Sequence, residues 1–184
     1  VILVNNKELK SYNPIYYLKT LEETYKKYNP DFLVFGHTYE TRDWVPRLSA
    51  RISLPFATDC TDLEPETPIN FIRPIYQAKL SEKIILHNNK GIISFQSGSF
   101  SVDNIENGKS EIEEISFDLS NITPNIRPGE KFRESANEVD LSSADIIVSV
   151  GRGISKQENI PLVEKLAEKL NAQIAASRPV VDSG

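Results

Sequence analysis

The segment ADIIVSVGRGISKQENIPLVEKLAEKLNAQIAASR (residues 144–178) decides the fold of the carboxyl-terminal part of this chain. An apolar run over residues 144–150 predicts a strand of the parallel type, because such strands are buried on both faces. Apolar side chains then recur at helical spacing over residues 160–170, and AQIAAS (residues 172–177) predicts a second strand. We therefore expect one βαβ unit, in which a helix joins two parallel strands.

Two residues compete as the start of this helix. Ser155 and Glu158 have the spacing of a capping box, but that start would place Pro161 deep in the helix and remove a hydrogen bond. Asn159 as the N-cap puts Pro161 in the first turn, where its missing N–H costs little. We expect the helix to begin after Asn159 and to end at Asn171.

Both predicted strands end in residues that suit an anionic ligand. GRG (residues 151–153) closes the first strand and SRP (residues 177–179) closes the second. Parallel strands end at one edge of a sheet, and open α/β sheets bind ligands there. Glycines let the backbone approach a phosphate, and arginine adds a fork of donors. The full G-x-G-x-x-G is absent, because Lys156 holds the third position, so a tight turn with a solvated arginine and a polar loop remain the alternatives.

The first half of the chain alternates predicted strands and helices. VILV (residues 1–4) and DFLVFG (residues 31–36) predict buried strands, and between them a helix should start at Asn13 and stop at Asn29. A second helix is expected in TRDWVPRLSARIS (residues 41–53). Strand, helix, strand, helix in this order predicts a parallel α/β sheet.

A second candidate anion site lies in GHTYETRDWVPR (residues 36–47), which follows a strand and enters a helix. We take Asp43 as the N-cap of this helix, because it places Pro46 in the first turn. The alternative is structural: Asp43 caps the helix, and three arginines form only its solvated face, namely Arg42, Arg47 and Arg51.

The middle of the chain has a different character. Residues 68–120 contain short β-type runs separated by turns, which indicates an antiparallel elaboration or a parallel strand with hairpins beside it. Residues 123–140 have no clear period and carry prolines and many charges, as a linker does. We therefore expect an N-terminal domain over residues 1–122, a linker over 123–140 and the start of another domain over 141–184.

Several classes of protein are disfavoured. A net charge of -5 and a pI near 5.2 argue against a nucleic-acid surface. No apolar run approaches the roughly 18 residues of a membrane span, and no signal peptide is visible. The lone Cys60 favours the cytosol, and its acidic neighbours would raise the pKa of the thiol, against a nucleophilic role. His37 and His87 have no carboxylate at metal-ligand spacing, so we expect no catalytic residue and no metal.

Two blocks of the chain resemble the alpha subunit of electron transfer flavoproteins, including the FixB-like branch. PDFLVFGHTYETRDWVPRLSARISLPFATDCTDLE (residues 30–64) is similar to the family's strand, its GRDLAPRLAARL helix and its T-D segment, with Thr41 in place of the usual glycine. SADIIVSVGRGISKQENIPLVEKLAEKLNAQIAASRPVVDSG (residues 143–184) resembles the family signature at nearly every position. The resemblance covers most of the chain.

The resemblance implies a nucleotide-hydrolase-like, parallel-sheet α/β domain with added strands, followed by the first βαβ unit of a Rossmann-like FAD-binding domain. It implies FAD as the cofactor, with Arg152, Ser177 and Arg178 as contacts, in an electron carrier rather than a substrate-converting enzyme. It also implies a heterodimer with a beta subunit that passes electrons from dehydrogenases to a quinone-linked or other acceptor. The expected compartment is the cytoplasm of a prokaryote or the mitochondrial matrix of a eukaryote.

The family pattern extends beyond both ends of this chain. We therefore expect an internal fragment that lacks the first strand and helix and most of the FAD domain, and that binds FAD weakly or not at all by itself. Two other functions stay open. The chain could be a truncated paralogue that acts as a non-redox heterodimerisation module, or a small-nucleotide-binding protein that uses residues 36–43. The lack of a glycine-rich loop there counts against the second.

Overall fold

The computed structural model of the chain describes residues 1–103, 105, 106, 108–129, 141 and 144–182. The chain divides into two compact units, Val1–Gly129 and Glu130–Gly184. The main elements of the first unit are β1 (Ile2–Val4), α1 (Pro14–Tyr28), β2 (Phe32–Gly36), α2 (Tyr39–Ile52), β3 (Phe56–Cys60), β4 (Asp62–Glu64), β5 (Asn70–Ile75), β6 (Leu80–Ile85), β7 (Gly91–Phe95) and β8 (Glu113–Ile115). Those of the second are β9 (Ile147–Val150), α3 (Ile160–Leu170), β10 (Gln173–Ala176) and α4 (Arg178–Val181).

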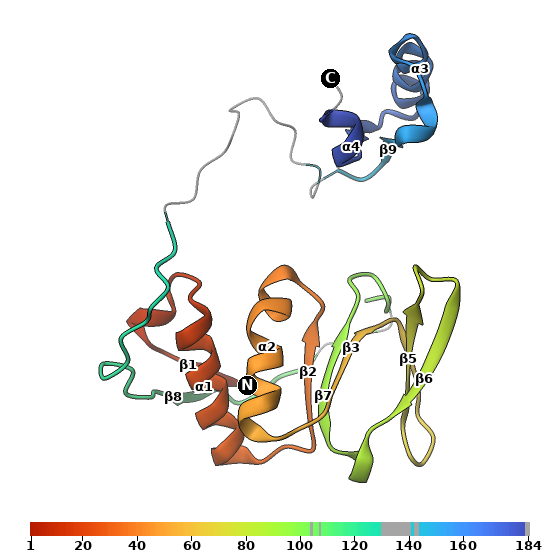
Figure 1. Cartoon of the computed structure of the whole chain (residues 1–184). Helices are drawn as coiled ribbons and strands as arrows, with labels where there is room; N and C mark the ends of the chain where they lie inside the picture. The colour runs from red at the N-terminus through yellow and green to blue at the C-terminus, as the bar shows by residue number, and fades with distance from the viewer. Residues whose placement is uncertain (104, 107, 130–140, 142–143, 183–184) are drawn as a thin grey trace. The chain divides into compact units, whose positions relative to one another are not determined.

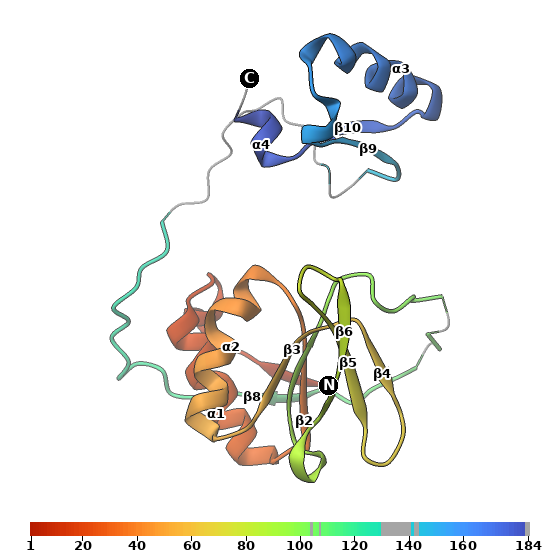
Figure 2. The same cartoon turned by 45° about the vertical axis from the view of Figure 1, so that its right-hand side comes forward.

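The centre of the first unit is a parallel sheet in the order β2-β7-β3. Helices α1 and α2 cover one face of this sheet, where Trp44, Val45 and Leu48 pack around Ile92. The antiparallel strands β4, β5 and β6 cover the other face, with Phe71 in the contact. Figures 1 and 2 show the central sheet between the helices and the antiparallel strands. The predicted α/β class with a parallel sheet is confirmed.

Of the two arrangements expected for residues 68–120, the structure has a parallel strand with a hairpin beside it. β7 lies between β2 and β3 and is parallel to both, while β5 and β6 form the hairpin. β1 pairs in parallel with β8. The expectation of a buried strand at residues 1–4 is wrong in one respect, because Ile2 and Leu3 of β1 are 41% and 49% exposed.

Helix α1 begins and ends where the sequence predicts. The side-chain oxygen of Asn13 accepts a hydrogen bond from the Ile15 N–H at 3.0 Å, and Pro14 takes the first helical position, where a missing N–H costs nothing. The helix stops because Asn29 turns to the left-handed conformation, with φ 44°. Both ends are set by residues within one turn, so a local pattern predicts them.

Helix α2 begins four residues before the predicted N-cap. Thr38 is the N-cap, and its hydroxyl accepts a hydrogen bond from the Thr41 N–H at 3.2 Å. Asp43 instead lies on the exposed face, where its carboxylate accepts from Arg47 at i+4 and from the Tyr12 hydroxyl, both at 2.9 Å. The prediction of Asp43 as N-cap is therefore wrong.

Pro46 lies inside α2, although an interior proline removes one backbone hydrogen bond. The exposed position of Pro46 places its missing bond on the solvent side of the helix. The added first turn also brings Thr41 into the buried side of the helix, in line with Trp44, Val45 and Leu48. Burial of an apolar face offsets the cost of the proline here.

The second unit is the predicted βαβ unit. β9 and β10 pair in parallel, with Val150 level with Ala176, and α3 joins them and packs through the buried Ala167. α3 starts after Asn159 and stops at Asn171, which is left-handed with φ 50°. Figure 2 shows the two strands beside α3 and the short α4 that follows β10.

Part of the predicted linker, residues 130–140, lies outside the described residues, and residues 123–129 contain no helix or strand. Among the helices that the structure describes, none is long and apolar enough to cross a membrane.

The start of α2 can be tested with Thr38→Ala, which removes the capping hydroxyl. We expect the free energy of unfolding to fall by about 1 kcal/mol, because one N–H of the first turn loses its acceptor. Urea unfolding followed by the fluorescence of Trp44, the single tryptophan, measures the change. Thr38→Ser keeps the hydroxyl and should cost much less; equal losses in both variants would contradict this capping role.

Candidate functional site

The carboxyl ends of β9 and β10 lie side by side. The register pairs Val150 with Ala176, and the Ser177 N–H donates a hydrogen bond to the Val150 carbonyl at 2.9 Å. The two segments predicted to bind a ligand, residues 151–153 and 177–179, therefore leave the sheet at the same edge. This edge is where parallel α/β sheets hold their ligands.

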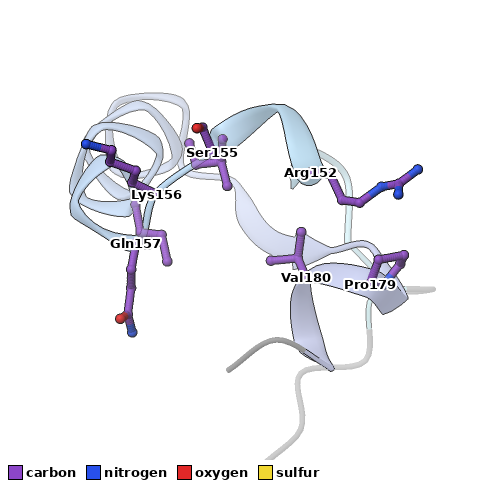
Figure 3. Close-up of a pocket in the computed structure, with 8 residues that line it drawn as sticks. Arg152, Ser155, Lys156, Gln157, Pro179 and Val180 are labelled. Atoms are coloured by element: carbon purple, nitrogen blue, oxygen red, sulfur yellow. The ribbon is translucent and has the colours of Figure 1, made fainter.

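A cavity of about 500 Å³ lies between these segments. This volume is within the range of small-molecule and cofactor pockets. The residues that line it come from the loop after β9, the start of α3 and the segment after β10; they are Arg152, Ile154, Ser155, Lys156, Gln157, Ile160, Pro179 and Val180. Figure 3 shows the Arg152 guanidinium and the Lys156 ammonium at opposite sides of the view, pointing away from each other.

The three residues predicted as ligand contacts have different positions. Arg152 is exposed and lines the cavity, in a 3-10 turn over Arg152–Ile154. The carbonyl of Ser177 accepts hydrogen bonds from Val180 and Val181 and so begins α4. Arg178 points its Nε to the Asp182 carboxylate at 3.0 Å, and its side chain is 87% exposed. The structure thus brings Arg152 to the segment that carries Arg178.

Gly151 and Gly153 are not required by the fold of the described residues. A Cβ atom built at either one meets no atom within 4 Å, and neither has a φ in the left-handed region. Gly91 is different, because a Cβ there would lie 2.7 Å from Leu86 Cδ1 and 3.0 Å from the Pro55 carbonyl oxygen. Gly91 is therefore explained by packing, whereas the two glycines after β9 leave bare backbone facing open space. Bare backbone at a strand end lets a phosphate or another polar group approach closely.

The loop between β9 and α3 contains a turn that the sequence does not reveal. Ser155 has φ 66° and ψ -48°, and the Lys156 N–H donates to the Ile154 carbonyl at 2.7 Å. These values define a γ-turn of the rare, strained kind, with a side chain where glycine would be easier. No residue type in ISKQEN marks such a turn; the capping-box spacing of Ser155 and Glu158 pointed to a different structure.

Asn159 precedes α3 as predicted, but it does not cap the helix with its side chain. Its backbone is already helical, with φ -86° and ψ -12°, so the side chain points back along the chain. Its Nδ2 donates to the Ile154 carbonyl at 2.9 Å. The expected capping bond is therefore replaced by a bond to the γ-turn.

At the second candidate anion site, residues 36–47, the structure agrees with the structural alternative for the arginines, although Thr38 and not Asp43 caps the helix. The N–H groups of Thr41 and Arg42 donate to the side chain and carbonyl of Thr38, so these two are not available to an anion. Arg42 lies over the Tyr39 ring at 5.5 Å, and the ion pairs of Arg47 with Asp43 and Arg51 with Glu22 occupy the other two arginines. The three arginines form the solvated face of α2.

Sequence reasoning also missed a polar cluster at the carboxyl edge of the central sheet. His37 Nδ1 lies 3.0 Å from the Ser94 hydroxyl, and His37 Nε2 lies 3.4 Å from Asp59. Asp59 is left-handed, with φ 63°, at a shift in the register between β3 and β7. Ser94 is fully buried, and the described residues contain no group of three or more potential metal ligands. The contacts of His37 with Ser94 and Asp59 therefore connect the carboxyl ends of β2, β7 and β3.

Cys60 behaves as a structural residue. Burial raises the pKa of its thiol to about 11; Arg73 lowers the pKa and Asp59 raises it to smaller extents. The expected direction is confirmed, but burial has a larger effect than the acidic neighbours.

Comparison with known proteins gives matches over both units. Residues 1–120 match the electron transfer flavoprotein domain, and residues 140–184 match the electron transfer flavoprotein FAD-binding domain. The chain is 30% identical over 185 residues to "Electron transfer flavoprotein subunit alpha" of Bacillus subtilis, and 28% identical over 188 residues to "Protein FixB" of Clostridium saccharobutylicum. Each alignment covers 100% of this chain and 56% of the relative.

A third relative is "Acryloyl-CoA reductase electron transfer subunit beta" of Anaerotignum propionicum, which is 29% identical over 221 residues. That alignment covers 100% of this chain and 59% of the relative. The chain thus spans a little over half the length of each of these three relatives.

The contrast between the glycines gives a direct test. Gly91→Ala should lower the free energy of unfolding by about 1–3 kcal/mol, because the new methyl overlaps Leu86 and a backbone oxygen. Gly151→Ala and Gly153→Ala should leave the fold and its stability nearly unchanged, as judged by circular dichroism and thermal unfolding. Destabilisation by the last two as large as that of Gly91→Ala would mean that they are structural.

Proposed function

The chain belongs to the electron transfer flavoprotein family, and on that premise we propose that it supplies one wall of an FAD site in an alpha-type subunit. The observation that carries this proposal is the bare backbone of Gly151 and Gly153, next to Arg152 and level with the start of Ser177–Val180. Neither glycine is explained by folding, and both lie where a dinucleotide approaches an α/β sheet.

The residues at this edge fit an anionic dinucleotide. FAD, when bound, supplies reversible electron transfer at its isoalloxazine ring. The proposed role of Arg152 is to bind an anionic or polar part of the cofactor through its forked donors. Ser177, at the end of β10, would offer a hydroxyl beside the same ligand. No acid, base or nucleophile is required, in keeping with an electron carrier rather than a substrate-converting enzyme.

Arg178 has the role that the family resemblance suggests, next to the flavin ring. A cation there would favour a negatively charged ring, and tenfold stabilisation would correspond to about 59 mV for one electron. The ion pair of Arg178 with Asp182 does not oppose this role, because it is almost fully exposed and such pairs are weak. Rotation of the side chain from Asp182 to a ligand therefore costs little.

The wider assembly is part of the proposal. Family membership supports a beta-subunit partner and, beyond it, dehydrogenases as electron donors and a quinone-linked oxidoreductase or another acceptor. The proposed compartment is the cytoplasm of a prokaryote or the mitochondrial matrix of a eukaryote. The proposed domain limits are residues 1–122 and 141–184, joined by a linker at 123–140; the two domain matches end at 120 and begin at 140.

The test is to co-express the chain with an electron transfer flavoprotein beta subunit and to measure the flavin spectrum and the reduction potential. We expect co-purified FAD, and a fall in one-electron potential of roughly 60 mV in Arg178→Ala, which corresponds to about tenfold weaker stabilisation of the reduced form. Arg178→Lys should fall between wild type and Arg178→Ala, because lysine keeps the charge but loses the planar fork.

Arg42→Ala is the matched control, because it removes the same charge from the solvated face of α2. It should leave both FAD content and potential unchanged. A stable heterodimer without flavin would instead support the alternative function, a non-redox heterodimerisation module.

A further inference from the structure

The carbonyl of Ile154, at the strained turn, accepts two hydrogen bonds. Two backbone bonds flank the turn: the Ser155 N–H donates to the Arg152 carbonyl at 3.2 Å, and the Asn159 N–H donates to the Lys156 carbonyl at 3.1 Å. The Ile154 oxygen accepts from the Lys156 N–H at 2.7 Å and from Asn159 Nδ2 at 2.9 Å. The first bond closes the γ-turn, and the second ties the turn to the start of α3. A non-glycine residue in such a conformation persists only where its surroundings hold it, and such residues concentrate at functional sites.

The turn determines what the cavity wall presents. The cavity is lined by four residues of this loop, namely Arg152, Ile154, Ser155 and Lys156. The γ-turn reverses the chain between Ile154 and Lys156. Asn159 is well placed as an anchor, because it directly precedes α3, which is packed against β9 and β10.

We propose that Asn159 is a positioning residue for the flavin site: its side-chain amide holds the γ-turn at Ser155 and thereby fixes the loop that carries Gly151, Arg152 and Gly153. The inference rests on the proposed function, since it names the residue that shapes the same site. Asn159 does not touch the cavity itself, as its amide is directed to the Ile154 carbonyl.

If Asn159 served only to start α3, a different experimental result would be expected. Asp is as good an N-cap as Asn, so Asn159→Asp would be harmless if the residue only began the helix. A carboxylate cannot donate, however, and its oxygen would face the Ile154 carbonyl in place of the amide. The substitution has nearly the same shape and separates the two roles.

The experiment uses Asn159→Asp in the chain co-expressed with the beta subunit, and measures amide hydrogen exchange at Lys156 and the dissociation constant of FAD. We expect exchange at Lys156 to rise and FAD affinity to fall by about 3- to 10-fold each, the effect of one lost hydrogen bond. Helix content from circular dichroism should not change. Asn159→Ser, which is a good cap without an amide or a charge, should show the same losses.

Asn171→Asp is the control, because it makes the same chemical change at the far end of α3 and outside the cavity. It should leave Lys156 exchange and FAD affinity as in wild type. If wild type binds FAD and Asn159→Asp matches it in both measurements, the positioning role is overturned while the FAD site stands. If the wild-type complex binds no FAD, the proposed function fails, and the positioning role fails with it.

Discussion

Parallel pairing of β9 with β10 is the constraint on which the candidate site depends. It sets Val150 level with Ala176, so that the chain leaves both strands at one edge. The bond from the Ser177 N–H to the Val150 carbonyl extends the pairing one residue further and holds the two exit segments together. A slip of one residue would turn every side chain of a strand to the opposite face. The cavity between residues 152–160 and 179–180 exists because this register is kept.

The loop beyond β9 combines two features that its own packing does not require. Gly151 and Gly153 fill no steric need, and Ser155 occupies a strained conformation that glycine would adopt more easily. In the proposed FAD site, this bare backbone and the turn bonded to Asn159 would together form a preorganised binding loop.

Features set within one or two turns were predicted from the sequence, and features set by tertiary burial were not. Asn13, Asn29 and Asn171 mark helix ends through their own backbone and side chains, and the pattern found all three. The start of α2 was missed because burial of its apolar face keeps Pro46 in the helix interior, against local preference. The bond from Asn159 to Ile154 was missed because the sequence marks the residue as a cap, and only the structure shows where its amide points. The family resemblance, rather than periodicity, pointed to a flavin at the predicted edge.

Chemical-shift mapping of FAD on the ¹⁵N-labelled chain tests the central claim most directly, because it detects weak binding and locates it. The account predicts that added FAD shifts the amide signals of Gly151, Gly153 and Ser155, together with those of Ser177, Arg178 and Val180. The amides of residues 36–43, where the N–H groups of Thr41 and Arg42 already donate to Thr38, should stay in place. Shifts confined to residues 36–43 would contradict the account and place the ligand at the other sheet.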